Sequence, residues 1–401
     1  MKKLISIVGG LVLLLALTVG GTLLFRLIQF HSAVAELKAA GHPVAIADLK
    51  RVNSAAGQEG LALLKRILGP LKSFDTAMWA ADEEALSRDV DAKMIAQFEE
   101  LVATQPKLFP MLMELSLASE IGSDIEGDSL EFLNALMERE LIPRYCARVL
   151  AWKARVEAAQ GKPDEAVLAG LEILRIARLF DAEPMLVSQL VSLATRGIGI
   201  DSIHSVIANQ DIAPATRARL NQELELHDAL PGYQASLYGE RAFGIETISE
   251  MGMIHVAYSG MGYLDVIQDE IECAGEESFE LSSFTASKVG ERANTALGQS
   301  LFPAFEQVRG ALFRVRSRLR ALRIVNALER QQEVGSIPVS SEDLIGLGVP
   351  MVMTIDTMTG EPMKIKRVGS AWVVYSVGAN LIDDGGDFNA QADWGVGPET
   401  E

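Results

Sequence analysis

Hard oxygen donors are concentrated near the carboxyl end of the chain, in the segment NLIDDGGDFNAQAD. Calcium takes about 6–8 oxygens from carboxylates, amides and backbone carbonyls, and Gly385-Gly386 allows the backbone to bend around a small ion. The strict helix-loop-helix calcium pattern is absent, because Ala392 stands where that pattern requires glycine. The segment therefore predicts a calcium loop or, alternatively, a solvated acidic tail. The candidate ligands are Asn380, Asp383, Asp384, Asp387, Asn389 and Asp393.

A small α+β module, residues 335–401, is expected to position this loop. Residues 363–368 and 371–377 alternate as strands do, and Gly369-Ser370 between them suits a two-residue hairpin turn. A short helix capped by Ser340 or Ser341 is expected before the hairpin. The loop would then follow directly from the second strand.

This module resembles the C-terminal half of the major pseudopilin of type II secretion systems over roughly the last 90 of the 401 residues. The likeness implies that the strand end Tyr-Ser-Val-Gly leads into a calcium-binding loop. It also resembles the end of a group of bacterial membrane-anchored proteins with long helical bodies. The amino terminus lacks the Gly-Phe-Thr-Leu-Ile-Glu processing site of pseudopilins, so the resemblance carries over the loop and not assembly into a pilus. The matching elements, in order, are Gly335, Ile337-Pro338, Asp343-Leu344, Asp356, Gly360, Pro362, Tyr375-Ser376-Val377-Gly378, Asp383-Asp384-Gly385-Gly386 and Ala392-Asp393-Trp394.

The first thirty residues predict a transmembrane anchor. Residues 4–25 carry no charge, and as a helix they would cover roughly 33 Å, which matches a bilayer core. A cleaved signal peptide is the alternative, because Ala33-Val34-Ala35 has the small residues of a cleavage site. Lys2 and Lys3 favour a cytoplasmic amino terminus, which places the bulk of a bacterial inner-membrane protein in the periplasm.

The remaining chain is predicted to be mainly helical. The composition is 49% hydrophobic but only 6% aromatic, which favours long helices. Residues 31–231 are expected to form a helical body, either an irregular bundle or an array like tetratricopeptide repeats, for which residues 155–180 have the hairpin pattern. Residues 232–298, rich in Gly, Ser and Tyr, predict an irregular connection. Cys146 and Cys273 could be two free thiols or one disulfide.

Residues 299–334 predict a long arginine-rich helix. Apolar residues recur along it every three or four positions and form one seam. The arginines could contact lipid headgroups or a partner, but pairing with carboxylates of an acidic body is the favoured alternative. The seam contains Phe305, Val308, Leu312, Val315, Leu319 and Leu322, and the arginines are Arg314, Arg316, Arg318, Arg320 and Arg323.

The sequence contains no recognisable catalytic motif, so a non-enzymatic, membrane-anchored scaffold with a calcium-stabilised module is expected. A component that docks with secretion or pilus-type machinery is one alternative. The other is an enzyme with a site in residues 232–298, for which Glu240, Arg241 and His255 are candidates. The net charge of −18 disfavours nucleic acid as a partner.

Overall fold

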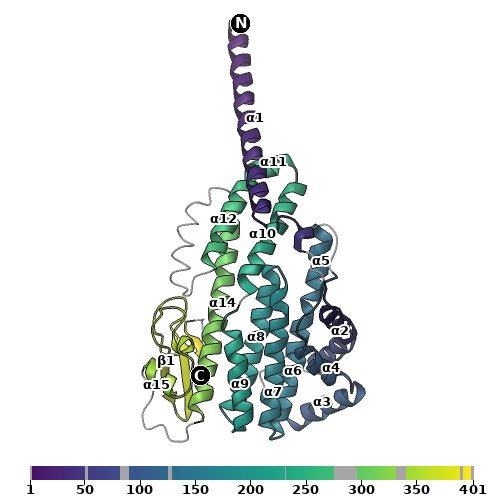
Figure 1. The fold of residues 1–401 in the computed structure, drawn as a ribbon, viewed down its shortest axis with the longest axis vertical. Helices are drawn as coiled ribbons and strands as arrows, with labels where there is room; N and C mark the ends of the chain where they lie inside the picture. Colours follow the sequence, from purple (N-terminus) through teal and green to yellow (C-terminus); the bar gives the residue numbers. More distant parts are fainter. Residues whose placement is uncertain are drawn as a thin grey trace.

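The computed structural model describes residues 2–49, 53–81, 90–124, 129–230, 232–274, 296–330, 340–388 and 392–398. For residues 2–13, 16, 79–81 and 296–304 it describes the backbone alone. These residues are mainly helical, and a small antiparallel sheet lies beside the helices near the carboxyl end (Figure 1). The prediction of a mainly α protein with a small C-terminal sheet is confirmed at this level.

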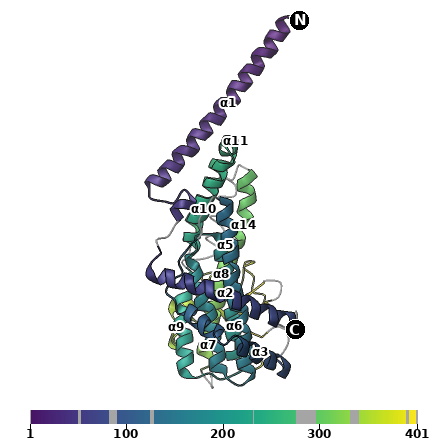
Figure 2. The ribbon, with the colours of Figure 1, turned by 90° about the vertical axis from the view of Figure 1, so that its right-hand side faces the viewer.

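Helix α1, Lys2–Ala39, rises from one end of the body, and its amino-terminal part stands clear of it (Figures 1 and 2). Its last turns pack on the body, where Phe30 is buried against Gly260. The predicted boundary at residue 30 therefore falls inside one continuous helix. Among the described residues, no helix has both the length and the apolarity that a membrane crossing requires. The predicted span covers residues 4–25. The structure does not describe the side chains of residues 4–13 and 16 within it.

Helices α2 to α5 form one side of the body (Figure 1). Helices α2, α3 and α4 share a core with α6 and α7, whereas α5 packs in a smaller cluster with Ile46 and Met185. Phe74 packs edge to face on Phe98 and on Phe109, each with ring centroids 5.6 Å apart. This aromatic contact joins the three helices that carry these residues. The bounds are η1 Ile46–Leu49, a 3-10 turn, α2 Ala55–Ala81, α3 Ala92–Thr104, α4 Leu108–Ser116 and α5 Ser129–Arg139.

Helices α6 to α9 stand side by side in the middle of the body (Figure 1). The hairpin predicted within residues 155–180 is present: Gly161, at φ +72°, ends α6, and Pro163 begins α7. Helices α7 and α8 approach closely, because a Cβ on Gly170 would lie 2.4 Å from Ile203. The relation to tetratricopeptide repeats stays a prediction. The bounds are α6 Leu141–Ala159, α7 Pro163–Leu179, η2 Phe180–Ala182, α8 Leu186–Ile207 and α9 Pro214–His227.

The predicted irregular connection is helical over residues 232–250 and 253–273, so that prediction was wrong there. The glycines of this segment allow neighbouring parts of the chain to pack closely against its helices. A Cβ on Gly239 would lie 1.6 Å from the carbonyl oxygen of Pro184, and one on Gly244 would lie 2.1 Å from the ring of Tyr263. Residues 275–295 lie outside the described part. The elements are α10 Gly232–Glu250, α11 Met253–His255, the π-helical turn η3 Val256–Gly260 and α12 Met261–Cys273.

Helix α14, Ala296–Leu328, is the predicted arginine-rich helix, and it lies between the body and the C-terminal module (Figure 1). All six residues of the predicted seam are buried. Trp372 and Val374 of the sheet belong to the same apolar cluster as that seam, so the module and the body share one core.

The module contains the predicted short helix and hairpin. Ser340 caps α15 and forms a reciprocal capping box with Asp343. Val368 pairs with Ala371 across the predicted turn, where Gly369 has φ +62°. A third strand, which the sequence analysis did not predict, adds to the second in the order β1-β2-β3. The bounds are α15 Ser341–Gly346, η4 Met351–Thr354, β1 Lys364–Val368, β2 Ala371–Ser376 and β3 Trp394–Val396.

Both cysteines are buried free thiols. The disulfide alternative for Cys146 and Cys273 is therefore wrong. Burial raises the pKa of the Cys146 thiol.

Candidate functional site

The predicted calcium loop joins β2 to β3, and its middle lies against the sheet face of Val373 and Tyr375, where a Cβ on Gly386 would lie 2.9 Å from Val373 and 3.2 Å from Tyr375. The sheet fixes both of its ends, since Ser376 pairs with Trp394. The ends approach so closely that only glycine fits. A Cβ on Gly378, which has φ +65°, would lie 1.8 Å from the carbonyl oxygen of Ala392.

A buried carboxylate holds the first end of the loop. Asp356 is only 1% exposed and accepts hydrogen bonds from Ser376 Oγ at 2.6 Å and from the backbone N of Val377 at 3.1 Å. It also accepts from the backbone N of Met358 at 2.7 Å, which closes the turn before β1. Asp356 is not among the ligands predicted from the sequence. Its place in the pseudopilin-like residue order was the available signal.

Three predicted ligands, Asn380, Asp383 and Asp384, lie on the exposed part of the loop. The Nδ2 of Asn380 donates to Asp384 Oδ2 at 2.7 Å. Asp383 Oδ1 accepts from the Tyr375 hydroxyl at 2.9 Å and from the backbone N of Gly385 at 3.0 Å. The bond from Tyr375 fixes the orientation of Asp383 relative to β2, and the bond from Asn380 holds Asp384 within the loop. Burial raises the pKa of Tyr375, and the hydrogen bond to Asp383 raises it further.

Asp393 differs from the other described candidates because it is buried, at 2% exposure. Its Oδ2 accepts from the backbone N of Gly386 at 2.6 Å, whereas its Oδ1 is buried and has no hydrogen-bond partner among the described residues. Burial raises its pKa, and the nearby carboxylates of Asp383 and Asp384 raise it further. An unsatisfied buried carboxylate oxygen costs free energy. A bound cation would remove that cost.

The donors have the chemistry that calcium requires, but they do not form a closed cage. Among the described residues, no group of three or more His, Cys, Asp or Glu side chains is arranged to hold a metal ion. Asp387 lies next to Asp393, whose backbone N donates to the Asp387 carbonyl oxygen at 3.0 Å. Asn389 lies outside the described residues. The structure thus forms two groups, Asp387 with Asp393 and Asn380 with Asp383 and Asp384.

A hollow of about 840 Å³ lies beside the loop, between α8, α14 and β3. Asp393 lines it together with Trp394, and the guanidinium of Arg314 lies 5.3 Å from the ring centroid of Trp394. Arg318 forms an ion pair with Asp201 of α8 and donates to the Gly395 carbonyl oxygen at 3.3 Å. The arginines of α14 therefore attach the module to the body along this hollow.

The other arginines of α14 also face the acidic body. Arg320 donates to both carboxylate oxygens of Asp228, at 2.8 and 2.9 Å, and Arg323 lies 3.2 Å from Glu225. The Nε of Arg316 donates to the Asp228 carbonyl oxygen at 3.0 Å. These contacts confirm the predicted pairing with the body for most of the arginines.

The three candidates for an enzyme site have different partners. Glu240 Oε2 accepts from the Leu186 backbone N at 3.4 Å, and Arg241 donates to Gln268 at 3.0 Å. His255 is exposed, and its Nδ1 lies 3.0 Å from the Met251 carbonyl oxygen. None of the three lines the hollow described above or a second one of about 540 Å³ beside α2 and α4. The structure does not bring them together.

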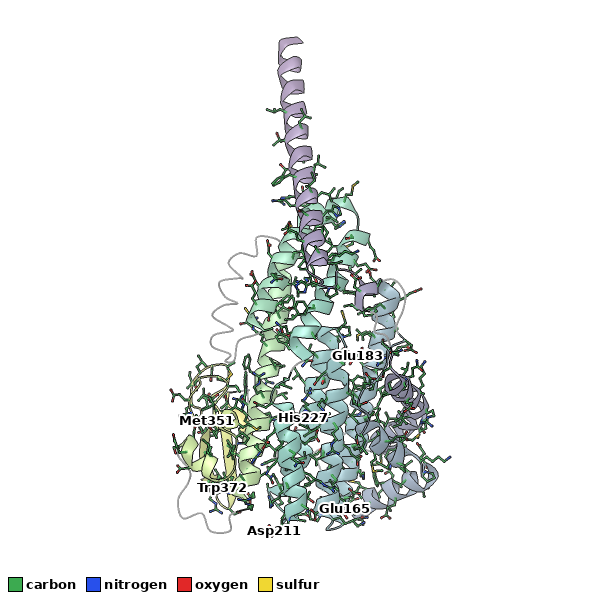
Figure 3. The ribbon with its side chains drawn as sticks, in the orientation of Figure 1. Glu165, Glu183, Asp211, His227, Met351 and Trp372 are labelled. Carbon is green, nitrogen blue, oxygen red and sulfur yellow. The ribbon has the colours of Figure 1, made fainter. Side chains whose placement is uncertain are left out.

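His227 belongs to a buried polar network that joins helices of the body. His227 lies inside the helical body (Figure 3), where its Nδ1 accepts from Arg196 at 2.9 Å and its Nε2 lies 3.3 Å from Glu223. Arg196 also forms a buried ion pair with Asp181. Burial lowers the pKa of His227 to about 4, so it is neutral at pH 7. This network joins α8, α9 and η2.

Comparisons of the chain with protein-family models, with curated proteins and with solved structures found no match. The fold defines a mainly helical protein that carries a three-stranded sheet at its carboxyl end. The resemblance to pseudopilins rests on the order of residues in the module and stays a prediction.

Proposed function

We propose that this protein is a non-enzymatic, single-pass scaffold of the bacterial inner membrane, with a cytoplasmic amino terminus and a periplasmic body. The supporting observation is the part of α1 that stands clear of the body. It carries large apolar side chains that are exposed to an unusual degree for a soluble helix. Those described are Leu14 (63%), Leu15 (65%), Leu17 (66%), Leu24 (58%), Phe25 (61%) and Ile28 (58%).

The other end of α1 supports a scaffold held at a fixed distance from the membrane. Phe30 is buried at 1% exposure, and Leu27, Val34 and Leu37 pack against the main apolar cluster of the body. A continuous helix joins the proposed anchor to this packed segment. The body would thus sit directly on the membrane surface, without a flexible linker.

Membrane fractionation tests the anchor. We expect the full chain to stay in the membrane pellet after alkaline carbonate extraction, because a spanning helix is not released by loss of charge contacts. A variant with Leu14→Arg, Leu15→Arg and Leu17→Arg should move to the soluble fraction, since arginine at a helix centre costs about 2.5–3.5 kcal/mol per residue for insertion. Release of the unaltered chain by carbonate would contradict the anchor.

A cysteine reporter tests the orientation. Cys146 and Cys273 are buried, so a membrane-impermeant maleimide should label only an introduced cysteine. Ile345 of α15 is 43% exposed, and Ile345→Cys places the reporter on the module. Labelling in intact spheroplasts is expected. Labelling only after lysis would place the module in the cytoplasm.

Calcium is proposed to stabilise the loop of the module. The unpartnered Oδ1 of Asp393 and the neighbouring negative charges of Asp383 and Asp384 support this. The ion would be held by these three carboxylates with Asn380, Asp387 and Asn389, after Asp383 and Asp384 turn toward Asp393. It would supply positive charge where the loop concentrates negative charge.

Thermal melting with calcium and with a chelator tests this site. Binding to the folded state alone stabilises it by about 2.7 kcal/mol at a hundredfold excess over Kd. The Asp393→Asn variant should lose most of this calcium-dependent shift. The Glu361→Gln variant, which changes an exposed acid of the same module outside the loop, should keep it. Identical melting curves with calcium and chelator would contradict the calcium proposal and leave the anchor unaffected.

A further inference from the structure

The turn between α10 and α12 ends in a patch of exposed apolar side chains, called here the tip patch. Its members are Met251 (59% exposed), Met253 (74%), Ile254 (67%) and Tyr258 (56%). In the same turn Val256, Ala257 and Gly260 are buried. The buried set attaches the turn to the body, and the tip patch faces outward.

The chain around the tip patch lacks charge. Residues 251–264 contain no Asp, Glu, Lys or Arg, although the protein carries 90 such residues in 401. A surface that contacts only water in so acidic a protein would be expected to carry charged groups. An uncharged apolar turn on this surface indicates a partner that is itself apolar.

The position of the tip patch identifies that partner. The turn lies at the end of the body from which α1 rises (Figures 1 and 2). It contacts α1 directly, because a Cβ on Gly260 would lie 2.5 Å from the Phe30 ring. The five residue-to-residue steps from Phe25 to Phe30 rise about 7.5 Å in a helix. The headgroup layer on each side of a bilayer is about 5–8 Å thick, so the tip lies at the depth of that layer if residues 4–25 span the core.

We propose that the tip patch inserts into the outer headgroup layer of the same membrane that α1 crosses. This inference rests on the proposed membrane anchor. Methionine and isoleucine supply apolar area that would enter the edge of the acyl region, and Tyr258 has the apolar ring and polar hydroxyl typical of residues at membrane interfaces. With α1 and the tip patch both in the bilayer, the body has two attachment points and cannot rotate freely about α1.

Fluorescence quenching in vesicles tests this second contact. The full chain is reconstituted in neutral phosphatidylcholine vesicles with an environment-sensitive dye on one introduced cysteine. The positions are Ile254→Cys in the tip patch, Leu14→Cys in the anchor and Ile345→Cys as a matched control on α15, all exposed in the structure. The chain without an introduced cysteine should take up no dye, because both native thiols are buried.

Nitroxide lipids quench the dye from a shallow or a deep position in the bilayer. We expect dye at residue 254 to lose several-fold more fluorescence than dye at residue 345, and more with the shallow nitroxide than with the deep one. Dye at residue 14 should be quenched most by the deep nitroxide.

The three positions separate the two proposals. Quenching at residue 14 with none at residue 254 overturns the tip contact and leaves the anchor standing. An absence of quenching at both positions overturns the anchor and the tip contact together. A dye at residue 254 that is shielded from water but not quenched by lipid would mean that a protein surface, such as a second copy of the chain, covers the patch, and this also overturns the proposal.

Discussion

Two glycine-to-alanine substitutions should change stability in opposite directions, although both lie inside helices. Alanine in a helix interior is favoured over glycine by about 0.5–1 kcal/mol, because glycine loses more backbone freedom on folding. Gly310 of α14 has no atom within 4 Å of an added Cβ. Gly310→Ala should therefore stabilise the protein by about that amount.

Gly239→Ala should destabilise it. The added Cβ would lie 1.6 Å from the carbonyl oxygen of Pro184, which is backbone and cannot rotate away. Helix α10 and the residues before α8 would have to separate by more than an ångström, and overpacking of this kind costs about 1–3 kcal/mol after the helix gain is included. The free energies of unfolding of the two variants should then differ by roughly 1.5–4 kcal/mol.

Thermal and denaturant unfolding in one detergent, followed by circular dichroism, measure both effects. The midpoint of Gly310→Ala should rise slightly and that of Gly239→Ala should fall. If Gly239→Ala were as stable as Gly310→Ala, the close packing of α10 would be refuted.

Two further predictions concern buried carboxylates. Asp356→Asn should destabilise the module by about 1.5–3 kcal/mol, because it removes a charged acceptor of three hydrogen bonds, and Glu361→Gln on the exposed surface should be neutral in the same melting assay. Glu140, at 2% exposure, has its pKa raised from 4.5 to about 7, first by burial and also by the neighbouring Glu183. The pKa of Glu140 is higher in the folded state than in the unfolded state, so Glu140 contributes most to the free energy of unfolding below pH 4.5. That contribution is lost as the pH rises to 7, and the loss is roughly 3 kcal/mol. The free energy of unfolding, measured across this pH range, should depend less on pH in Glu140→Gln than in the unaltered protein. The Glu138→Gln variant, which changes an exposed neighbour, should keep the pH dependence of the unaltered protein. If Glu140→Gln also kept that pH dependence, the raised pKa of Glu140 would be contradicted.

The parts of the fold that the sequence predicted are those governed by local spacing. The seam of α14 follows from apolar residues three and four positions apart, and the hairpin follows from alternation around Gly369-Ser370. The cap of α15 likewise requires only Ser340 and Asp343, three residues apart. Each of these signals depends only on residues a few positions apart, so the sequence alone is enough to reveal it.

The errors have a common physical cause. In residues 232–273, the Gly-, Ser- and Tyr-rich composition predicts an irregular connection, but Gly239 and Gly244 are required by contacts with Pro184 and Tyr263. Nothing in the local sequence distinguishes a glycine that frees the backbone from one that admits a neighbouring helix. The third strand was missed for a similar reason, since three residues, Trp394–Val396, are too few for a strand pattern.

The candidate loop combines both kinds of information. The types of its oxygen donors and the Gly385-Gly386 bend follow from the sequence alone. The tertiary structure decided which donors are exposed, that Asp393 is buried with one oxygen unpartnered, and that Asp356 holds the start of the loop from twenty residues away. Amino-acid types determine which chemistry a segment can perform, because functional groups are local. Burial and partnership depend on residues distant in the chain, and only the folded structure brings them together.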